Sequence, residues 1–552
     1  MKVKLKKDPK SDIREIEVAE GTRIEDVVNR YRTETPYRVV AAKVDNKLED
    51  LSFLLKQPCT IEFQDIRQRE AHLVYQQSLC FVYLKAVFDV LGKVDVSIRH
   101  PLNQGIYTKI GTAPVTEQQV AQIEKQMRNI IAEDIPVIRK SMKRKEAFEF
   151  LTADGQDEKA RILEKNPDIE WVRFYSIGDY SDFFYDLLTP STGYIEYFEI
   201  RKYQNGVLLR FPNSASPKEI PAYRDDVKLY EAFREAKRWE QIMEIAHVAD
   251  LNDKIRAGQY KDLIQLSEAL HEKKVAEIAD KIAQQKKRVI LIAGPSSSGK
   301  TTFAKRLCVQ MRVNGYHPLY MSTDDYFVER ALTPLDAYGE PDFESIDAIE
   351  VKMFNEHING LLRGEEVDLP TFDFINGTKK FGARIASLRA GEPIVVEGIH
   401  ALNEAMTPAI SKESKFKIYI SPFTQLNLDE HNRIPVTDGR MLRRMVRDNQ
   451  FRGHSARKTI NAWPKVRAGE DKYIFPYNGE ADVFFNSAHI YELAVLKKYA
   501  WPLLTDISPE APEYGEAARM LRFLSFFEPI EDDSIIVNNS IMREFIGGSV
   551  FV

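Results

Sequence analysis

The stretch VILIAGPSSSGKTT, residues 289–302, decides the fold of the C-terminal part of this chain. Five apolar residues run into Gly294, and Gly299, Lys300 and Thr301 then complete the pattern G-x-x-x-x-G-K-S/T. The apolar run predicts a buried parallel strand, and the residues after the loop predict a helix. A glycine-rich turn between the two brings backbone N–H groups and the positive end of the helix dipole to a polyphosphate. The stretch therefore predicts a nucleotide-binding loop.

The residues of this loop have distinct expected roles in binding Mg·ATP. Lys300 is expected to reach the β- and γ-phosphates, and the Thr301 hydroxyl is expected to ligate Mg²⁺. The predicted nucleotide contacts are Gly294, Ser296, Ser297, Ser298, Gly299, Lys300, Thr301 and Thr302. ATP and Mg²⁺ are therefore the expected cofactors, while the choice between ATP and GTP as donor stays open.

Length and composition limit the class of protein. At 552 residues the chain exceeds one hydrophobic core and predicts about three or four domains. The net charge of -5 argues against a protein that coats nucleic acids generally. The widely spaced Cys59, Cys80 and Cys308 fit a reducing compartment, and neither a disulfide framework nor a zinc cluster. Without an apolar signal core or a run of about 18 apolar residues, a cytoplasmic protein with no membrane span is predicted.

Changes of pattern divide the chain into four predicted segments. Residues 1–65 combine short strands with one amphipathic helix, which is typical of a small β-grasp domain. Residues 66–225 mix a long helix with strands, and AsnGly at 205–206 marks a hairpin. Residues 226–286 predict a helical connector, and residues 287–552 alternate strands and helices as in a parallel α/β domain. The predicted fold class is multidomain, with α/β and α+β parts.

Acidic residues follow the strands predicted after the loop. Asp324 and Asp325 end the strand LYMS, and Glu397 ends the strand IVVE. Ligands of parallel α/β folds bind beyond the carboxyl ends of strands, so these carboxylates are expected to face the loop. One aspartate can accept a proton from an attacking hydroxyl, and Glu397 can hold Mg²⁺ together with Thr301. These residues predict a site for phosphoryl transfer.

Two further segments carry candidate contacts to an acceptor. The acidic residues of the stretch 342–350 can hydrogen-bond sugar hydroxyls. Phe372 and Phe374 in the stretch LPTFDF can stack on a base. The two segments together favour an acceptor that carries both a sugar and an aromatic ring.

A basic cluster lies further along the chain. Its members are Arg440, Arg443, Arg444, Arg447, Arg452, His454, Arg457 and Lys458. Arg440, Arg444 and Arg447 share one helical face because they are spaced by four and three residues. Only Asp438 and Asp448 offset this charge nearby, which favours a lid that closes over ATP rather than a solvated face. Arg444 and Arg447 are therefore predicted as catalytic groups and Arg452 as a nucleotide contact.

These segments follow one another as in a known family. Residues 289–487 resemble the uridine kinase and phosphoribulokinase family in the phosphate loop, SerThrAsp at 322–324, and the segments 343–350, 370–374, 397–399, 443–453 and 481–486. The resemblance implies that Asp324 is the general base and that Glu344 binds a ribose. It further implies that Tyr326, Phe372 and Arg444 contact the substrate. Gly377 and His454 depart from the family, which has a base-contacting histidine and a lid arginine there.

The activity that the resemblance implies is that of an ATP-dependent nucleoside kinase, which transfers the γ-phosphate to a nucleoside 5′-hydroxyl. Its catalytic residues would be Asp324, Lys300, Arg444 and Arg447. Two alternatives stay open: a kinase for another sugar or polyol, and a regulatory RNA-binding protein that uses ATP as a switch. The oligomeric state also stays open.

The front half, residues 1–225, has resemblances of its own. Glu20, Gly21 and Thr22, the stretch 41–44 and the stretch 48–51 resemble the TGS domain of threonyl-tRNA synthetases. The segment after it resembles the second additional domain of the same synthetases, whose editing site holds zinc. Here His72 is followed by Gln76, and the residues 188–191 supply no Cys or His, so zinc-dependent editing is rejected. The front half is expected either to bind RNA or a regulatory ligand, or to serve as a structural or oligomerisation module.

Overall fold

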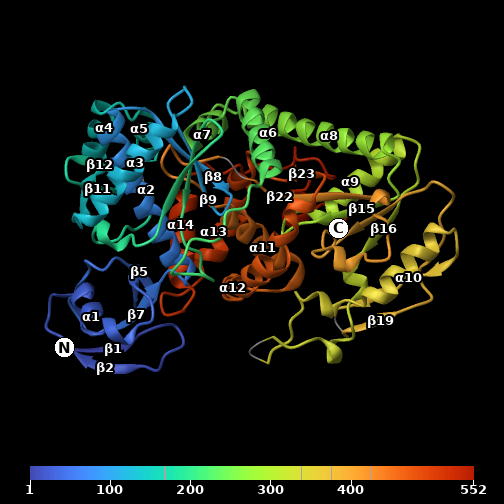
Figure 1. The fold of residues 1–552 in the computed structure, drawn as a ribbon, viewed down its shortest axis with the longest axis horizontal. Coiled ribbons are helices and arrows are strands. Elements are labelled where there is room, and N and C mark those ends of the chain that lie inside the picture. The colour runs from blue at the N-terminus through green and yellow to red at the C-terminus, as the bar shows by residue number, and fades with distance from the viewer. Residues whose placement is uncertain (167–168, 337–338, 375, 424–425) are drawn as a thin grey trace.

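The computed structural model describes residues 1–166, 169–336, 339–374, 376–423 and 426–552. Figure 1 shows the front half at one end of an elongated molecule and a parallel sheet at the other. Between them, the helices α6 (Val227–Met243) and α8 (Tyr260–Gln284) run along one side. The predicted fold class, a multidomain chain with α+β and parallel α/β parts, is confirmed.

The first unit is a sheet with the strand order β2-β1-β7-β4-β5. Its strands are β1 (Lys2–Lys6), β2 (Arg14–Glu17), β4 (Val39–Val44), β5 (Lys47–Glu49) and β7 (Thr60–Asp65). The helix α1 (Ile24–Arg30) buries Ile24, Val27 and Val28, and a small pair of strands joins β3 (Thr22–Arg23) to β6 (Leu54–Leu55). The parallel pairing of β1 with β7 beside a helix is the β-grasp arrangement that the sequence pattern predicted.

The rest of the front half holds two antiparallel sheets. One contains β8 (Val96–Leu102), β9 (Gly105–Ile110), β13 (Glu199–Tyr203) and β14 (Gly206–Arg210). The other contains β10 (Ile138–Lys143), β11 (Trp171–Ile177) and β12 (Tyr180–Phe183). The helices are α2 (Arg69–Leu91), α3 (Glu117–Ala132), α4 (Arg144–Ala153) and α5 (Asp157–Lys165). The first sheet and α2 share a core with the β-grasp unit, so the front half is one packed body.

The hairpin predicted at 205–206 forms one residue earlier than its AsnGly signal. Tyr203 pairs with Gly206, so the turn consists of Gln204 and Asn205, and Gln204 takes a φ of 50°. Gly206 already belongs to β14, where an added Cβ would stand 2.1 Å from the carbonyl oxygen of Thr108. The glycine is therefore required by close contact with the neighbouring strand rather than by the turn.

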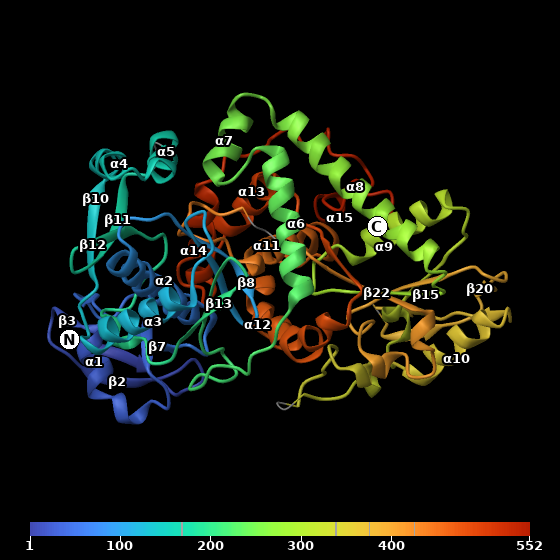
Figure 2. The same ribbon diagram turned by 45° about the horizontal axis from the view of Figure 1, so that its top comes forward.

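Three helices join the front half to the rest of the chain. They are α6 (Val227–Met243), α7 (Val248–Arg256) and α8 (Tyr260–Gln284). Figure 2 shows α6 and α8 crossing the molecule beside the parallel sheet. The buried face of α8 packs on α9 through Val275, Ile278 and Ile282. The connector is therefore a packed layer of the fold.

The C-terminal part is built on a sheet with the order β16-β21-β15-β22-β23, in which every pairing is parallel. The strands are β15 (Val289–Ala293), β16 (Leu319–Ser322), β21 (Ile394–Glu397), β22 (Lys415–Ser421) and β23 (Val483–Asn486). Every residue of β15 is buried, as its apolar run predicted. β15 occupies the centre of the sheet, so the loop after it opens at the middle of the carboxyl edge.

Helices cover this sheet and extend it toward the front half. They are α9 (Lys300–Val313), α10 (Val351–Leu362), α11 (Val436–Arg452), α12 (Ala456–Tyr473), α13 (Glu492–Thr505), α14 (Tyr514–Ser525) and α15 (Arg543–Ile546). Two short ribbons, β17 (Val367–Asp368) with β20 (Ile385–Ala386) and β18 (Thr371–Asp373) with β19 (Thr378–Lys380), project beside α10. None of the helices in the described residues has the length and apolar character needed to cross a bilayer.

Candidate active site

The predicted phosphate loop joins β15 to α9 with the backbone that its glycines allow. A Cβ on Gly294 would lie 2.0 Å from the carbonyl oxygen of Ile420, so only glycine fits beside β22. Gly299 has a φ of 82° and stands directly before α9, and Ser297 has a φ of 60°. The Ser297 and Ser298 hydroxyls are buried and have no hydrogen-bond partner among the described residues. The loop is thus a tight cradle of polar groups at a helix N-terminus, which suits a phosphate.

Thr301 and Glu397 come together as the sequence predicted for a metal site. The Thr301 hydroxyl donates to Glu397 Oε1 over 3.2 Å, and the Tyr320 and Ser322 hydroxyls donate to the same oxygen over 3.1 and 3.2 Å. Glu397 is only 6% exposed and lies at the end of β21. Hydroxyl and carboxylate oxygens are the donors that Mg²⁺ prefers, so these residues fit the ion.

Asp324 lies beyond the end of β16, within electrostatic reach of that pair. Burial, and next the nearby Glu397 charge, raise the pKa of Asp324 to about 7, and the Lys300 ammonium opposes this shift. Lys300 itself donates to the Pro295 carbonyl oxygen over 3.3 Å. A carboxyl group poised near neutrality beside a phosphate loop has the property expected of a general base.

The expectation that both aspartates face the loop was wrong for Asp325. Its carboxylate accepts from the Phe372 backbone N–H over 3.3 Å and pairs with Arg384 over 3.4 Å. The two side chains diverge because a short 3₁₀ turn, Thr323–Tyr326, follows β16. Asp325 therefore anchors the β18 ribbon rather than the site.

Tyr326, predicted as a substrate contact, lies instead in the hydrophobic core. It is 1% exposed, packs edge-on against Phe354, and bonds through its hydroxyl to His357 Nδ1 over 3.0 Å. Its aromatic ring packs in the hydrophobic cluster that joins the sheet to α10.

The other predicted acceptor contacts lie nearer the site. Burial, and next the Glu470 charge, raise the pKa of Glu344, while Arg444 and Lys300 oppose the shift. Phe372 packs against Phe374 and Phe327 with ring centroids 5.1 and 5.8 Å apart. Phe374 is 57% exposed, so this cluster presents an aromatic edge to solvent.

The basic cluster divides into two groups with different surroundings. Arg440 and Arg443 are fully buried and donate to the loop carbonyl oxygens of Ser296 and Ser297 over 3.2 and 3.4 Å. Their charges are balanced by Glu470 on α12 and Glu492 on α13. The charge imbalance inferred from the sequence was therefore wrong for these two, which hold the loop in place.

The predicted lid arginines form the second group. Arg444 donates to the Ser296 hydroxyl over 2.8 Å, so its guanidinium lies at the loop. Arg447 donates to Asp448 over 2.9 Å, and Arg452 lies 3.5 Å from the same carboxylate. Asp324 is among the charges that act on the pKa of Arg452. All three arginines thus surround the Asp448 carboxylate, and Arg444 among them reaches the loop.

Two acidic residues at the loop gave no signal in the sequence. Glu470 is 1% exposed and accepts from the Ser296 backbone N–H over 3.1 Å. Glu544 on α15 accepts from the Thr302 hydroxyl over 2.6 Å and from its N–H over 3.3 Å. Thr302, predicted as a nucleotide contact, therefore faces the C-terminal helix. Only a longer-range pairing rule could have found these residues, since 174 and 242 positions separate them from their partners.

The front half supplies no zinc ligands at the expected place. His72 Nε2 lies 2.9 Å from the Pro212 carbonyl oxygen, and its Nδ1 lies 3.1 Å from the Gln76 amide. Both ring nitrogens are thus engaged within the protein. Among the described residues, the group with metal-ligand character is a different one, Glu158, His247 and Glu430.

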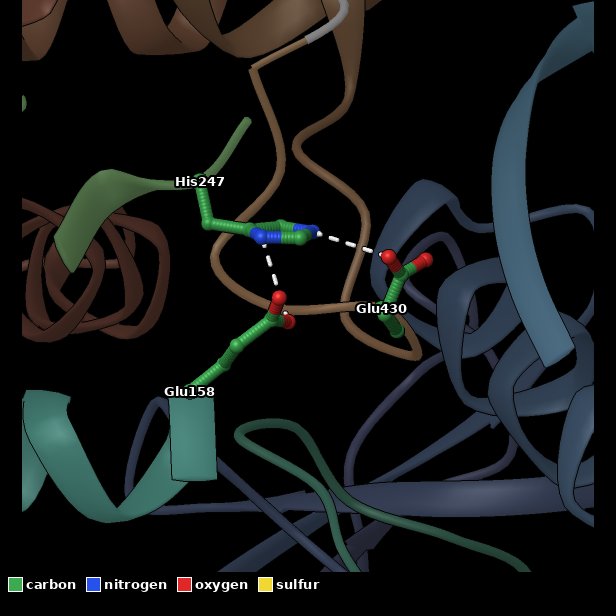
Figure 3. A group of neighbouring side chains, drawn as sticks. All are labelled: Glu158, His247 and Glu430. Carbon is green, nitrogen blue, oxygen red and sulfur yellow. Dashed lines mark ion pairs between the residues drawn. The ribbon is translucent and has the colours of Figure 1, made fainter. Parts of the chain in front are cut away.

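This group suits a charged histidine better than a metal ion. Figure 3 shows the two carboxylates approaching different ring nitrogens, with Glu158 3.1 Å from Nδ1 and Glu430 3.6 Å from Nε2. To bind a single metal ion, both carboxylates would have to lie beside the same ring nitrogen, so that all three ligand atoms point at one position. Burial lowers the pKa of His247, but Glu158 and Glu430 together raise it above its usual value. The two carboxylates therefore favour the protonated form of His247, and the three residues tie α5, the start of α7 and the segment before α11 together.

We expect His247→Gln to destabilise the protein at pH 6 by about 1.5–3 kcal/mol, the usual cost of losing charged hydrogen bonds. The raised pKa means that this stabilisation is complete below about pH 6.5 and disappears as pH rises through the folded-state value. Urea unfolding of both proteins at pH 6 and pH 9 measures the difference. His317→Gln, at a 66% exposed histidine, is the control. An equal loss at both pH values would contradict the charged state.

The two halves of the chain are similar to different known proteins. Residues 289–494 match the model of the phosphoribulokinase / uridine kinase family. A uridine kinase from Deinococcus deserti is 26% identical over 208 residues, which cover 38% of this chain and 91% of that protein. A solved structure from Bacillus stearothermophilus, described as a "Possible Uridine Kinase", is 21% identical with a TM-score of 0.27, over 39% of this chain and 97% of that one.

The front half is similar to a different class of protein. A threonine–tRNA ligase from Symbiobacterium thermophilum is 28% identical over 185 residues, which are 33% of this chain. The match covers 28% of that ligase, so the chain spans little more than a quarter of its length. The chain therefore joins a part that matches the phosphoribulokinase / uridine kinase family to a part that is similar to a piece of a tRNA ligase.

Proposed function

We propose that the protein is an ATP-dependent nucleoside kinase that transfers the γ-phosphate to a 5′-hydroxyl group. The observation that carries this proposal is that Lys300, the Thr301–Glu397 pair and Asp324 lie at one sheet edge, where the pKa of Asp324 is raised to about 7. The family match of residues 289–494 supports the phosphotransfer chemistry. The cytoplasm is the proposed location, and the RNA partner expected for the front half stays a prediction.

The residues have separate tasks in this proposal. Thr301 and Glu397 would hold Mg²⁺, which neutralises phosphate charge when bound. Lys300 leaves the Pro295 carbonyl for the β- and γ-phosphates, and the arginines of α11 stabilise charge on the transferred group. Asp324 takes the proton of the acceptor hydroxyl. The arginine–glutamate pairs beneath the loop keep it rigid, so that little reorganisation is needed during transfer.

Glu344 and the aromatic cluster support a base-bearing acceptor. Glu344 can accept hydrogen bonds from sugar hydroxyls, and the exposed edge of Phe374 offers a stacking surface. A sugar alone would use the carboxylate and leave the rings without a role. A nucleoside is therefore the acceptor that uses both features.

We expect nucleosides to support ATP consumption with kcat/KM at least about fivefold above ribose or polyols, because a stacked ring contributes about 1–3 kcal/mol. ADP release measured with a panel of nucleosides, ribose, ribulose 5-phosphate and polyols tests the acceptor. Phe374→Ala should reduce the difference in kcat/KM between nucleosides and ribose or polyols. Phe381→Ala, at another half-exposed ring, should leave that difference unchanged. A polyol preferred over every nucleoside would identify a different alcohol kinase.

A further inference from the structure

A small cavity with charged walls lies where the front half meets the C-terminal part of the chain. Its volume is about 30 Å³, and α2, the residues after β12, the segment before α11 and α14 form its walls. The charged residues lining it are Asp186, Arg433, Asp438, Arg519 and Arg522. The phosphate loop contributes nothing to these walls, so the cavity is separate from the candidate active site.

Two of these arginines have no carboxylate within ion-pair distance in the part of the chain that the structure describes. Arg433 and Arg522 make no hydrogen bond and no ion pair of 4.0 Å or less with any residue that the structure describes. Burial lowers the pKa of both guanidinium groups. Arg519 differs, because it lies 2.8 Å from both Asp438 and Glu516. A guanidinium without a partner in a half-buried cavity is costly unless an anion compensates it.

The acidic residues of the cavity do not supply that compensation. Asp438 accepts from Arg519 on one oxygen and from Arg69 on the other, so it is already satisfied. Asp186 acts on Arg522 electrostatically but makes no ion pair with it among the described contacts. Arg173 adds a further positive charge within reach of Arg522. The balance at the cavity is therefore positive.

The arginines are also held in position before any ligand arrives. Asn432, next to Arg433, donates its amide to the Phe183 carbonyl oxygen over 3.0 Å and accepts from the Tyr185 N–H over 3.4 Å. Arg522 lies on α14, whose Phe523 and Phe526 complete the cavity wall. The two unpaired arginines thus come from the C-terminal side of the interface, while α2 and the residues after β12 form the wall from the front half.

We propose that this cavity binds one compact tetrahedral oxyanion, namely a phosphate group, either as free phosphate or as the end of a phosphomonoester. Arginine forks match phosphate oxygens in pairs, and two such forks balance a dianion. The side-chain amide of Gln77 offers a further donor in the same wall. The cavity is small, so a ligand larger than a phosphate group would leave its remainder outside.

Occupancy would connect the front half to the helix that holds the phosphate loop. Asp438 lines the cavity and belongs to the first turn of α11, which carries Arg440, Arg443 and Arg444 to the loop. Binding itself does not depend on the proposed kinase activity. An effect of phosphate on turnover would depend on it, so binding and turnover are measured separately.

The test uses full-length Lys300→Ala protein, in which phosphate binding at the loop is weakened. Titration with inorganic phosphate at constant ionic strength, followed by calorimetry and ³¹P line broadening, should reveal one site. Arg433→Gln and Arg522→Gln should each weaken binding by about tenfold or more, the usual effect of losing a charged hydrogen bond. Arg389→Gln, at an exposed arginine, is the matched control and should bind as the parent does.

A variant that gains affinity for phosphate is a useful control, because a poorly folded protein would only lose affinity. Asp186→Asn removes the carboxylate that repels the anion, so it should bind phosphate more tightly than the parent. A nucleoside monophosphate that displaces phosphate would identify a phosphomonoester as a ligand, while failure to displace it would restrict the site to the free anion. Unchanged affinity in Arg433→Gln, Arg522→Gln and Asp186→Asn alike would overturn the proposal.

Discussion

Lys300→Ala should lower kcat/KM for ATP-dependent phosphoryl transfer by about 10³-fold, the upper range for loss of one preorganised charge donor. Lys300 begins α9, and its charge opposes the raised pKa of both Asp324 and Glu344. The ammonium group therefore lies at the phosphate loop and within electrostatic reach of both predicted acceptor groups. Removing it leaves the β- and γ-phosphates without their nearest cation and raises the pKa of the predicted base. Steady-state ADP release measures the loss.

The matched control is Lys352→Ala. This lysine is 92% exposed on α10, and its nearest acidic partner, Glu356, is 3.9 Å away. Such a pair contributes little to stability, and the residue lies away from the loop. Turnover should therefore stay at the wild-type value. A Lys300→Ala enzyme that keeps more than about a tenth of wild-type kcat/KM would show that the loop does not bind the transferred phosphate.

The parts of the site that depend on strand order could be predicted from the sequence. Asp324 and Glu397 end neighbouring parallel strands, and parallel strands must end at the same edge of a sheet. Thr301 follows the central strand β15, so its contact with Glu397 follows from the same rule. The sequence pattern contains this information because a short apolar run marks each of these strands, and the polar residues of the site stand at the end of the run or soon after it.

The parts that depend on side-chain direction or distant pairing could not be predicted. Asp324 and Asp325 are adjacent and chemically identical, and only the turn after β16 separates their directions. Arg440 and Arg443 looked free because Glu470 and Glu492 lie 30 and 49 residues further along the chain. Tyr326 resembled a site residue, but packing against α10 buries it. In each case the direction or the partner of the side chain is set by tertiary packing, which the local sequence does not reveal.

Asp324→Asn should lower kcat by about 10²–10⁴-fold, the usual contribution of a general base, while nucleotide affinity is retained. An amide keeps the shape of the side chain but cannot take the proton of the acceptor. The wild-type protein should also show an acid limb in kcat/KM with a midpoint near 7, because the pKa of Asp324 is raised to about 7. The carboxylate form is the active one, so activity should rise with pH through this value and be lost below it.

Asp325→Asn is a stringent control, since it changes the adjacent carboxyl group. Asp325 pairs with Arg384 and accepts from the Phe372 N–H, so its loss should loosen the β18 ribbon and weaken acceptor binding. It should raise KM for the acceptor while kcat and the acid limb persist, whereas Asp324→Asn should abolish the limb. If the acid limb disappeared in Asp325→Asn and persisted in Asp324→Asn, Asp325 would be the general base that takes the proton of the acceptor hydroxyl. The divergence of the two side chains after β16 argues against that exchange of roles.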